Sequence, residues 1–192
     1  MMRRIERENT GLLHPGQDLV VAGYAGLAGT LKLVEAKKEE LSHWFSDEYM
    51  EEIADAAPLC PVSPEFWRSC GAAEWEPAGE GGILTAIWNL TGAYETGVKF
   101  YLRQIPMRQE TVEVCERLEL NPYRLYSRGC VLLTADNGGQ LVRILAEKHI
   151  PAQVIGRVNK GIAREMIVQE GRGFLERPQP DEITKVIPGF FK

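Results

Sequence analysis

Apolar and polar positions follow two different periods along this chain, one typical of helices and one typical of strands. The clearest helix is predicted at residues 80–94, where Ile83, Ile87 and Leu90 fall on one apolar stripe. A strand is predicted next, at residues 98–103, because apolar and polar side chains alternate there. A half-buried strand therefore follows an amphipathic helix in the middle of the chain.

The same two periods predict the remaining elements. Short apolar runs between turn residues predict strands at residues 17–23, 130–135, 152–158 and 165–169. Helical spacing predicts helices at residues 31–45, 46–57, 108–118 and 141–149, and a short one that begins at Pro64. The helix at 108–118 is expected to bury Val112, Cys115 and Leu118. The last two strands are expected to form a hairpin across Asn159-Lys160-Gly161.

Strands that alternate with amphipathic helices predict an α/β (α+β) domain of packed layers. Helices are more numerous at the start and strands at the end, so we expect a mixed β-sheet and not a parallel one. We divide the chain into an N-terminal arm (residues 1–15), one domain (16–176) and a C-terminal tail (177–192). The Pro-rich, polar stretch at 176–182 is expected to be an extended arm on the surface.

Composition narrows the class of protein. A chain of 192 residues suits one sizeable domain, and a hydrophobic content of 44% is ordinary for a globular protein. The net charge of −5 argues against nucleic acid as a partner. No apolar run approaches the length that spans a membrane, and the first residues have no signal-peptide pattern, so we expect a cytoplasmic protein. The four cysteines form no C-x-x-C pair, and we assign no metal site.

Two glycine-rich turns stand in front of predicted helices. The first is Gly26-Leu27-Ala28-Gly29-Thr30, and the second is Gly79-Glu80-Gly81-Gly82. Backbone amides that converge at a helix N-terminus suit a phosphate or another anion. Neither turn is a Walker A loop, because no G-K-[ST] follows. The other reading is a tight turn in which glycine permits close packing, and the sequence leaves both readings open.

Candidate acids and bases are scarce. The three histidines lie at positions typical of exposed or helix-end residues, and we assign none of them to catalysis. Glu74 and Glu76 lie two residues apart, so an extended backbone would place both on one face. Such a pair could hold a cation or a substrate amine, or it could be solvated. No catalytic residue is predicted.

Four stretches, in the same order and spacing, resemble the C-terminal domain of the aminoimidazole ribonucleotide (AIR) synthetase superfamily. They are GQDLVVAGYAGLAGT, EGGILTAIWNL, TGVKFYLRQIPMRQETVEVCERLELNPYRLYSRGCVLLTA and IPAQVIGRVNKG, and the likeness covers residues 16–176. The sequence is most similar to members of the hydrogenase-maturation-factor type. The resemblance implies the fold of that C-terminal domain.

The resemblance also implies what is lacking. Enzymes of this superfamily have an N-terminal domain that supplies the metal and ATP site, and here we expect that domain to be missing. Their C-terminal domain carries His-Asp-x-Thr before the paired glycines, where this sequence has Glu76, Pro77, Ala78 and Gly79. The hydrogenase-maturation enzyme ends in a cysteine, whereas this sequence ends in Gly189-Phe190-Phe191-Lys192.

Two functions follow as hypotheses. The first is a non-catalytic binding domain that takes a phosphate-containing ligand or a partner protein. Its ligand residues would be Gly26, Gly29, Thr30, Gly81, Gly82, Ser127, Arg128 and Gly129. The second is a component of an ATP-dependent enzyme, of the hydrogenase-maturation dehydration kind, completed by a separate ATP-binding chain. We expect no cofactor bound by this chain alone, phosphate or a nucleotide as the ligand, and a homo-oligomer (dimer) or a separate ATP-binding-domain protein as the partner.

Overall fold

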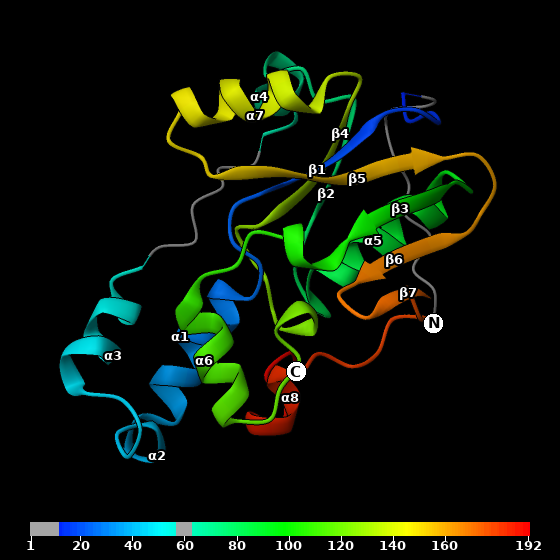
Figure 1. Ribbon diagram of the computed structural model, residues 1–192. Helices are drawn as coiled ribbons and strands as arrows, with labels where there is room; N and C mark the ends of the chain where they lie inside the picture. The colour runs from blue at the N-terminus through cyan, green and yellow to red at the C-terminus, as the bar shows by residue number, and fades with distance from the viewer. Residues whose placement is uncertain (1–11, 57–62) are drawn as a thin grey trace.

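The computed structural model describes residues 12–56 and 63–192. Its described part contains a seven-stranded mixed sheet in the order β2-β4-β1-β5-β3-β6-β7 (Figure 1). The strands are β1 (Asp18–Ala22), β2 (Glu74–Pro77), β3 (Gly97–Tyr101), β4 (Val131–Ala135), β5 (Ala152–Asn159), β6 (Arg164–Val168) and β7 (Gly171–Phe174). Strands β3 and β6 pair in parallel and the other described pairs are antiparallel, so the predicted mixed sheet is confirmed. Residues 1–11 of the predicted N-terminal arm (1–15) lie outside the described residues.

The predicted helices are present with shifted ends. The helices in the described residues are α1 (Leu27–Ala36), α2 (Lys38–Leu41), α3 (Asp47–Ala54), α4 (Pro64–Ser69), α5 (Gly82–Ala93), α6 (Gln109–Arg117), α7 (Gly138–Glu147) and α8 (Ile183–Val186), with 3-10 turns η1 (Leu102–Gln104) and η2 (Pro122–Arg124). Helix α8 lies in the predicted tail, where no helix was expected. Ser46 is the N-cap of α3, and its hydroxyl accepts a hydrogen bond from the Tyr49 amide. Within the described ranges, no helix has the length and apolar content needed to cross a bilayer.

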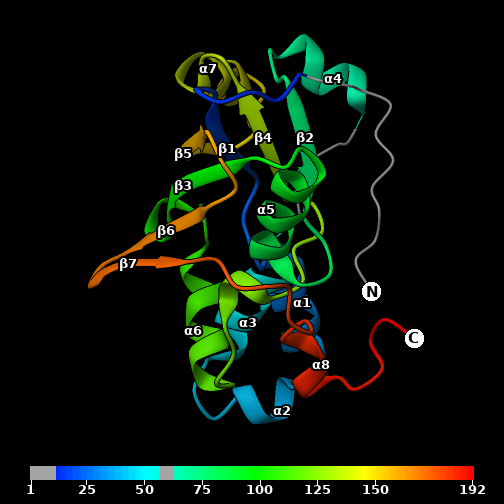
Figure 2. The same cartoon turned by 90° about the vertical axis from the view of Figure 1, so that its right-hand side faces the viewer.

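Helices cover the two faces of the sheet unequally. Helix α5 packs on one face, where its apolar stripe meets Leu19, Val21 and Phe100. Helices α7 and α4 pack on the other face, against β1 and β4 (Figure 1). Below the sheet, α1, α3, α6 and α8 bury a further apolar cluster around Leu33 and Val114. The turned view shows β3, β6 and β7 with α5 on one side and no helix on the other (Figure 2).

The hairpin predicted for the last strands is wrong. Strand β3 lies between them, antiparallel to β5 and parallel to β6. The connection crosses the start of β3, where the Val98 amide donates to the carbonyl of Ala163 at 2.9 Å. A Cβ at Gly97 would stand 2.6 Å from that carbonyl oxygen, so glycine permits the crossing. Local turn chemistry suggested a hairpin, but β3 pairs with β5 along one of its edges and with β6 along the other.

Two further expectations need correction. Cys115 is buried as expected, but Val112 is 45% exposed and Leu118 is half-buried, and α6 buries Thr111 and Val114 beside Cys115. In the stretch expected to lie on the surface, residues 176–180 are exposed but Asp181 and Glu182 are buried. Their carboxylates accept hydrogen bonds from backbone amides, and this bonding lets polar side chains enter the interior.

Candidate functional site

The two glycine turns meet at one loop, residues 121–129, which we call the junction loop. On one side of it, the Gly26 amide donates to the Ser127 hydroxyl at 2.8 Å. On the other side, the Ser127 amide donates to the carbonyl of Gly79 at 3.2 Å. Two turns that lie some fifty residues apart in the sequence are therefore joined through a single serine.

The first turn is shorter than predicted. Gly26, with φ of 75°, is the N-cap of α1, and Gly29 and Thr30 already lie inside the helix. The Thr30 hydroxyl donates to the Gly26 carbonyl at 2.9 Å, and the Gly29 amide donates to Tyr126 at 2.8 Å. A Cβ at Gly29 would stand 2.5 Å from the Leu125 side chain. These glycines thus bring α1 against the junction loop.

The second turn has the same backbone geometry. Gly81, with φ of 77°, is the N-cap of α5, and its amide donates to Asp181 Oδ2 at 2.6 Å. The Gly82 amide donates to the carbonyl of Gly79 at 3.1 Å. A Cβ at Gly82 would stand 2.5 Å from the Tyr123 carbonyl oxygen. Close packing and a positive φ therefore explain the glycine at position 82, whereas a Cβ at Gly79 would meet nothing within 4 Å.

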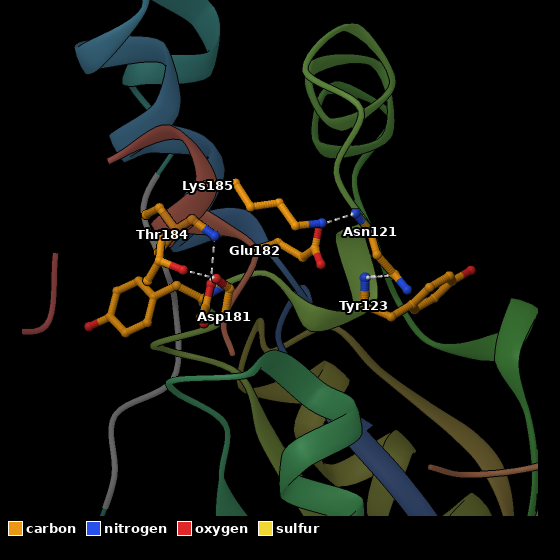
Figure 3. A network of polar contacts seen from close by, with 8 residues as sticks. Asn121, Tyr123, Asp181, Glu182, Thr184 and Lys185 are labelled. Carbon is orange, nitrogen blue, oxygen red and sulfur yellow. Dashed lines mark hydrogen bonds and ion pairs between the residues drawn. The ribbon is translucent and has the colours of Figure 1, made fainter. Parts of the chain in front are cut away.

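The carboxylate of Asp181 stands at the N-terminus of α5, where a bound anion would be stabilised (Figure 3). Its Oδ1 also accepts from the amides of Tyr126, at 3.1 Å, and Ile183, at 2.9 Å. Burial raises the pKa of Asp181, and the three backbone hydrogen bonds oppose that rise. An internal carboxylate therefore fills a position that the sequence suggested for a ligand.

Glu182 holds the same segment from its other side (Figure 3). Its Oε2 accepts from the Asn121 amide at 3.1 Å and from Lys185 Nζ at 2.6 Å. Asp181 and Glu182 together tie the start of α8 to the junction loop. Sequence reasoning missed both residues; the available signal was a pair of acidic residues directly before the short apolar stretch of α8.

The predicted ligand residues come together, but most of their polar groups have partners inside the chain. The amides of Gly26, Gly29, Gly81 and Gly82 all donate to internal acceptors. Thr30 and Ser127 are fully buried, and Gly129 is half-buried. Arg128 is the exposed member of the set. Binding of an anion by the glycine amides stays a prediction, whereas their role in close packing is visible.

Arg128 lies on the wall of a groove of about 770 Å³ beside the junction loop. We call it the α1–α3 groove. Its apolar lining is Ala28, Leu31, Val34, Met50, Ala54, Tyr126 and Phe190, and its charged lining is Lys32, Glu35, Lys38, Glu51 and Arg128. Lys32 pairs with Glu35 at 2.8 Å. Among the described residues, Arg128 makes no ion pair, so the groove offers one unpaired guanidinium above an apolar floor.

Groups suited to catalysis are few in the described part. Glu74 and Glu76 lie on β2, as an extended pair; Glu74 is buried, and Glu76 Oε1 is 3.4 Å from Asn89 Nδ2. Cys70, Cys115 and Cys130 are buried, and burial raises the pKa of Cys115 to about 12, which keeps its thiol protonated. In residues 12–56 and 63–192, no group of three His, Cys, Asp or Glu side chains could hold a metal.

Comparison with known proteins assigns the fold to a family. Residues 14–169 match the C-terminal domain of AIR synthase related proteins. Among solved structures, HypE of E. coli superposes with a TM-score of 0.72 at 19% identity, over 92% of this chain and 55% of that one. A chain of the HypE–HypF complex gives a TM-score of 0.64 at 18% identity, over 86% of this chain and 54% of that one. The thiamine-monophosphate kinase of Stenotrophomonas maltophilia K279a gives 0.58 at 17%, over 80% and 50%.

The limits of these matches are also informative. A search of curated proteins found no match. The chain spans about half the length of the solved structures that it resembles. Because the sequence identities are below 20%, these matches show a shared fold and nothing more. The family match, by contrast, extends over most of the chain, from β1 to β6. The chain therefore belongs to the AIR synthase related proteins and has the fold of their C-terminal domain.

Proposed function

We propose that this domain is a non-catalytic binding domain, and that it takes a ligand carrying a phosphate or another anionic group in the α1–α3 groove. One observation carries the proposal: Arg128 is exposed and makes no ion pair among the described residues, and it lines the groove. The loop that carries it is fixed by hydrogen bonds to both glycine turns.

The groove has the chemistry that such a ligand needs. Its volume lies within the usual range for small-molecule sites, which are mostly apolar with a few polar groups that fix orientation. A guanidinium presents parallel N–H donors that match two phosphate oxygens. The ring of Tyr126 is held by Phe190 at a centroid distance of 5.3 Å, so one wall of the groove is aromatic. Phosphate at Arg128 with an apolar or aromatic body over the floor is the expected pose.

Calorimetry with inorganic phosphate, ATP and aminoimidazole ribonucleotide tests this proposal. We expect at least one to bind, and Arg128→Gln to weaken it by about tenfold, the loss of roughly one charge-assisted hydrogen bond. Arg143→Gln is the matched control, because Arg143 is exposed on α7, outside the groove. Absence of binding at millimolar ligand, or equal binding by Arg128→Gln, would refute the ligand site.

A second function is favoured by the lengths of the similar structures. The chain covers 55% of HypE of E. coli, and another HypE that it resembles was solved in complex with ATP. An ATP-dependent enzyme, of the hydrogenase-maturation dehydration kind, could thus combine this domain with an ATP-binding domain from a separate chain. Mixing the purified chain with the separately expressed ATP-binding half of a HypE tests this: a stable complex that hydrolyses ATP supports it, and neither complex nor hydrolysis counts against it.

A further inference from the structure

One half of the sheet has an uncovered face. On β3, Val98 and Phe100 point toward α5 and are buried, so Lys99 and Tyr101 point away from it. The side of the sheet opposite α5 carries α7 and α4 only over its other half (Figures 1 and 2). Among the described residues, no helix therefore covers β3, β6 and β7 on the side that Lys99 and Tyr101 occupy.

Strand register identifies the side chains that share this side. Lys99 lies opposite Glu165, which lies opposite Phe174. In the next row Tyr101 lies opposite Ile167, which lies opposite Arg172. Directly opposed residues point to the same face, so these two rows form one surface. We call it the open sheet face: Lys99, Tyr101, Glu165, Ile167, Arg172 and Phe174.

The open sheet face combines exposed rings with unpaired cations. Tyr101 is 42% exposed and Phe174 is 66% exposed, and Ile167 lies half-buried between their strands. Lys99 and Arg172 are exposed, and neither makes an ion pair within the described ranges. Tyr, Phe and Arg are the residue types enriched in protein interfaces, where aromatic anchors contribute most of the binding energy.

We propose that the open sheet face docks an acidic segment of another protein, with apolar side chains of that segment seated on Tyr101, Ile167 and Phe174. Charge complementarity is the argument for an acidic partner. The whole chain has a net charge of −5, yet this face has two cations that make no ion pair with any described residue, against the single carboxylate of Glu165. Carboxylates of the partner would pair with Lys99 and Arg172 at the two ends of the apolar stripe.

Single-stranded nucleic acid is the other partner that uses aromatic rings and cations on a sheet. Glu165 disfavours it, because its carboxylate lies between Lys99 and Phe174 in the row that phosphates would cross. The negative charge of the chain disfavours it further. An acidic protein segment can place apolar side chains next to Glu165 and its carboxylates at the cations.

The test uses two synthetic amphipathic peptides of the same pattern, one of Glu and Leu and one of Lys and Leu, with oligouridylate as a third probe. We expect the Glu–Leu peptide to bind, more weakly as salt is raised, and to shift the amide resonances of Tyr101, Ile167 and Phe174. The double variant K99E/R172E should bind it about tenfold more weakly, or 1.4 kcal/mol. The double variant R143E/K148E on and beside α7 is the matched control and should bind normally.

Phe174→Ser supplies a second, uncharged variant at a position too exposed to affect folding. It should also weaken the Glu–Leu peptide, because the proposal gives the ring an apolar contact. Four outcomes would overturn the proposal: no Glu–Leu binding at millimolar peptide, resonance shifts away from the open sheet face, preference for oligouridylate, or a dimer in light scattering that K99E/R172E dissociates. The α1–α3 groove shares none of these residues, so failure of either site leaves the other unaffected.

Discussion

The two glycine turns have the same backbone geometry but different caps. Gly26 and Gly81 are both left-handed N-cap residues with no side chain of their own, and each amide is capped by a side chain about a hundred residues away. The neutral hydroxyl of Ser127 caps the first, at 2.8 Å. The carboxylate of Asp181 caps the second, at 2.6 Å.

The difference lies in how much each cap holds together. Ser127 accepts from one amide and donates to the carbonyl of Leu125 within its own loop. Asp181 accepts from amides of α5, the junction loop and α8, and so connects three segments. Burying a carboxylate is costly, and these donors offset the cost. Two glycine turns that look alike in the sequence therefore differ in the structure. Ser127 caps one helix N-terminus, whereas Asp181 joins three separate segments by hydrogen bonds.

The largest expected effect comes from filling the second turn. In Gly82→Ala, the new Cβ would lie 2.5 Å from the Tyr123 carbonyl oxygen at a φ of 67°, which side chains rarely adopt. Backbone strain and overlap together should lower the free energy of unfolding by about 4 kcal/mol, measured by urea denaturation. Gly79→Ala is the control, because a Cβ there meets nothing within 4 Å. Similar losses in both variants would contradict the packing role of Gly82.

The next effect separates the two caps directly. Asp181→Ala removes the acceptor of three amides, whereas Ser127→Ala removes the acceptor of one. We expect losses of about 3 kcal/mol and about 1 kcal/mol in the free energy of unfolding, since each unpaired buried donor costs about 1 kcal/mol or more. Equal losses from the two substitutions would mean that Asp181 connects no more of the structure than Ser127 does.

The sequence predicted most helices and strands because each has its own periodic pattern. The sequence-based predictions were wrong or incomplete where residues far apart in the chain determine the strand pairing or the helix cap. The pattern of residues 152–169 suggested a hairpin, and only the position of β3 separates those strands. Short strands such as β2 and β7 lack enough residues for a clear period. At the site, the glycines were found, but their caps were not, because no local rule relates Gly81 to Asp181.

The smallest expected effect is the pH dependence of the second cap. Burial holds the pKa of Asp181 above its ordinary value, so the folded chain binds this proton more tightly than the unfolded chain does. The contribution of Asp181 to stability is therefore complete below the ordinary carboxyl pKa and falls as pH rises through the raised one. Asp181→Asn removes the titration, and the stability of the wild type relative to this variant should decrease as pH rises through the ordinary carboxyl range and above it.

The first turn supplies the control for this pH effect. The Ser127 hydroxyl does not titrate in this range, so the offset between wild type and Ser127→Ala should stay constant with pH. Urea midpoints at several pH values would measure both offsets. The opposite result would be a difference in stability between wild type and Asp181→Asn that grows as pH rises. In that case the three amide hydrogen bonds would lower the pKa of Asp181 by more than burial raises it. Asp181 would then be stabilised as a carboxylate, and the position at α5 would favour negative charge more strongly than its burial disfavours it.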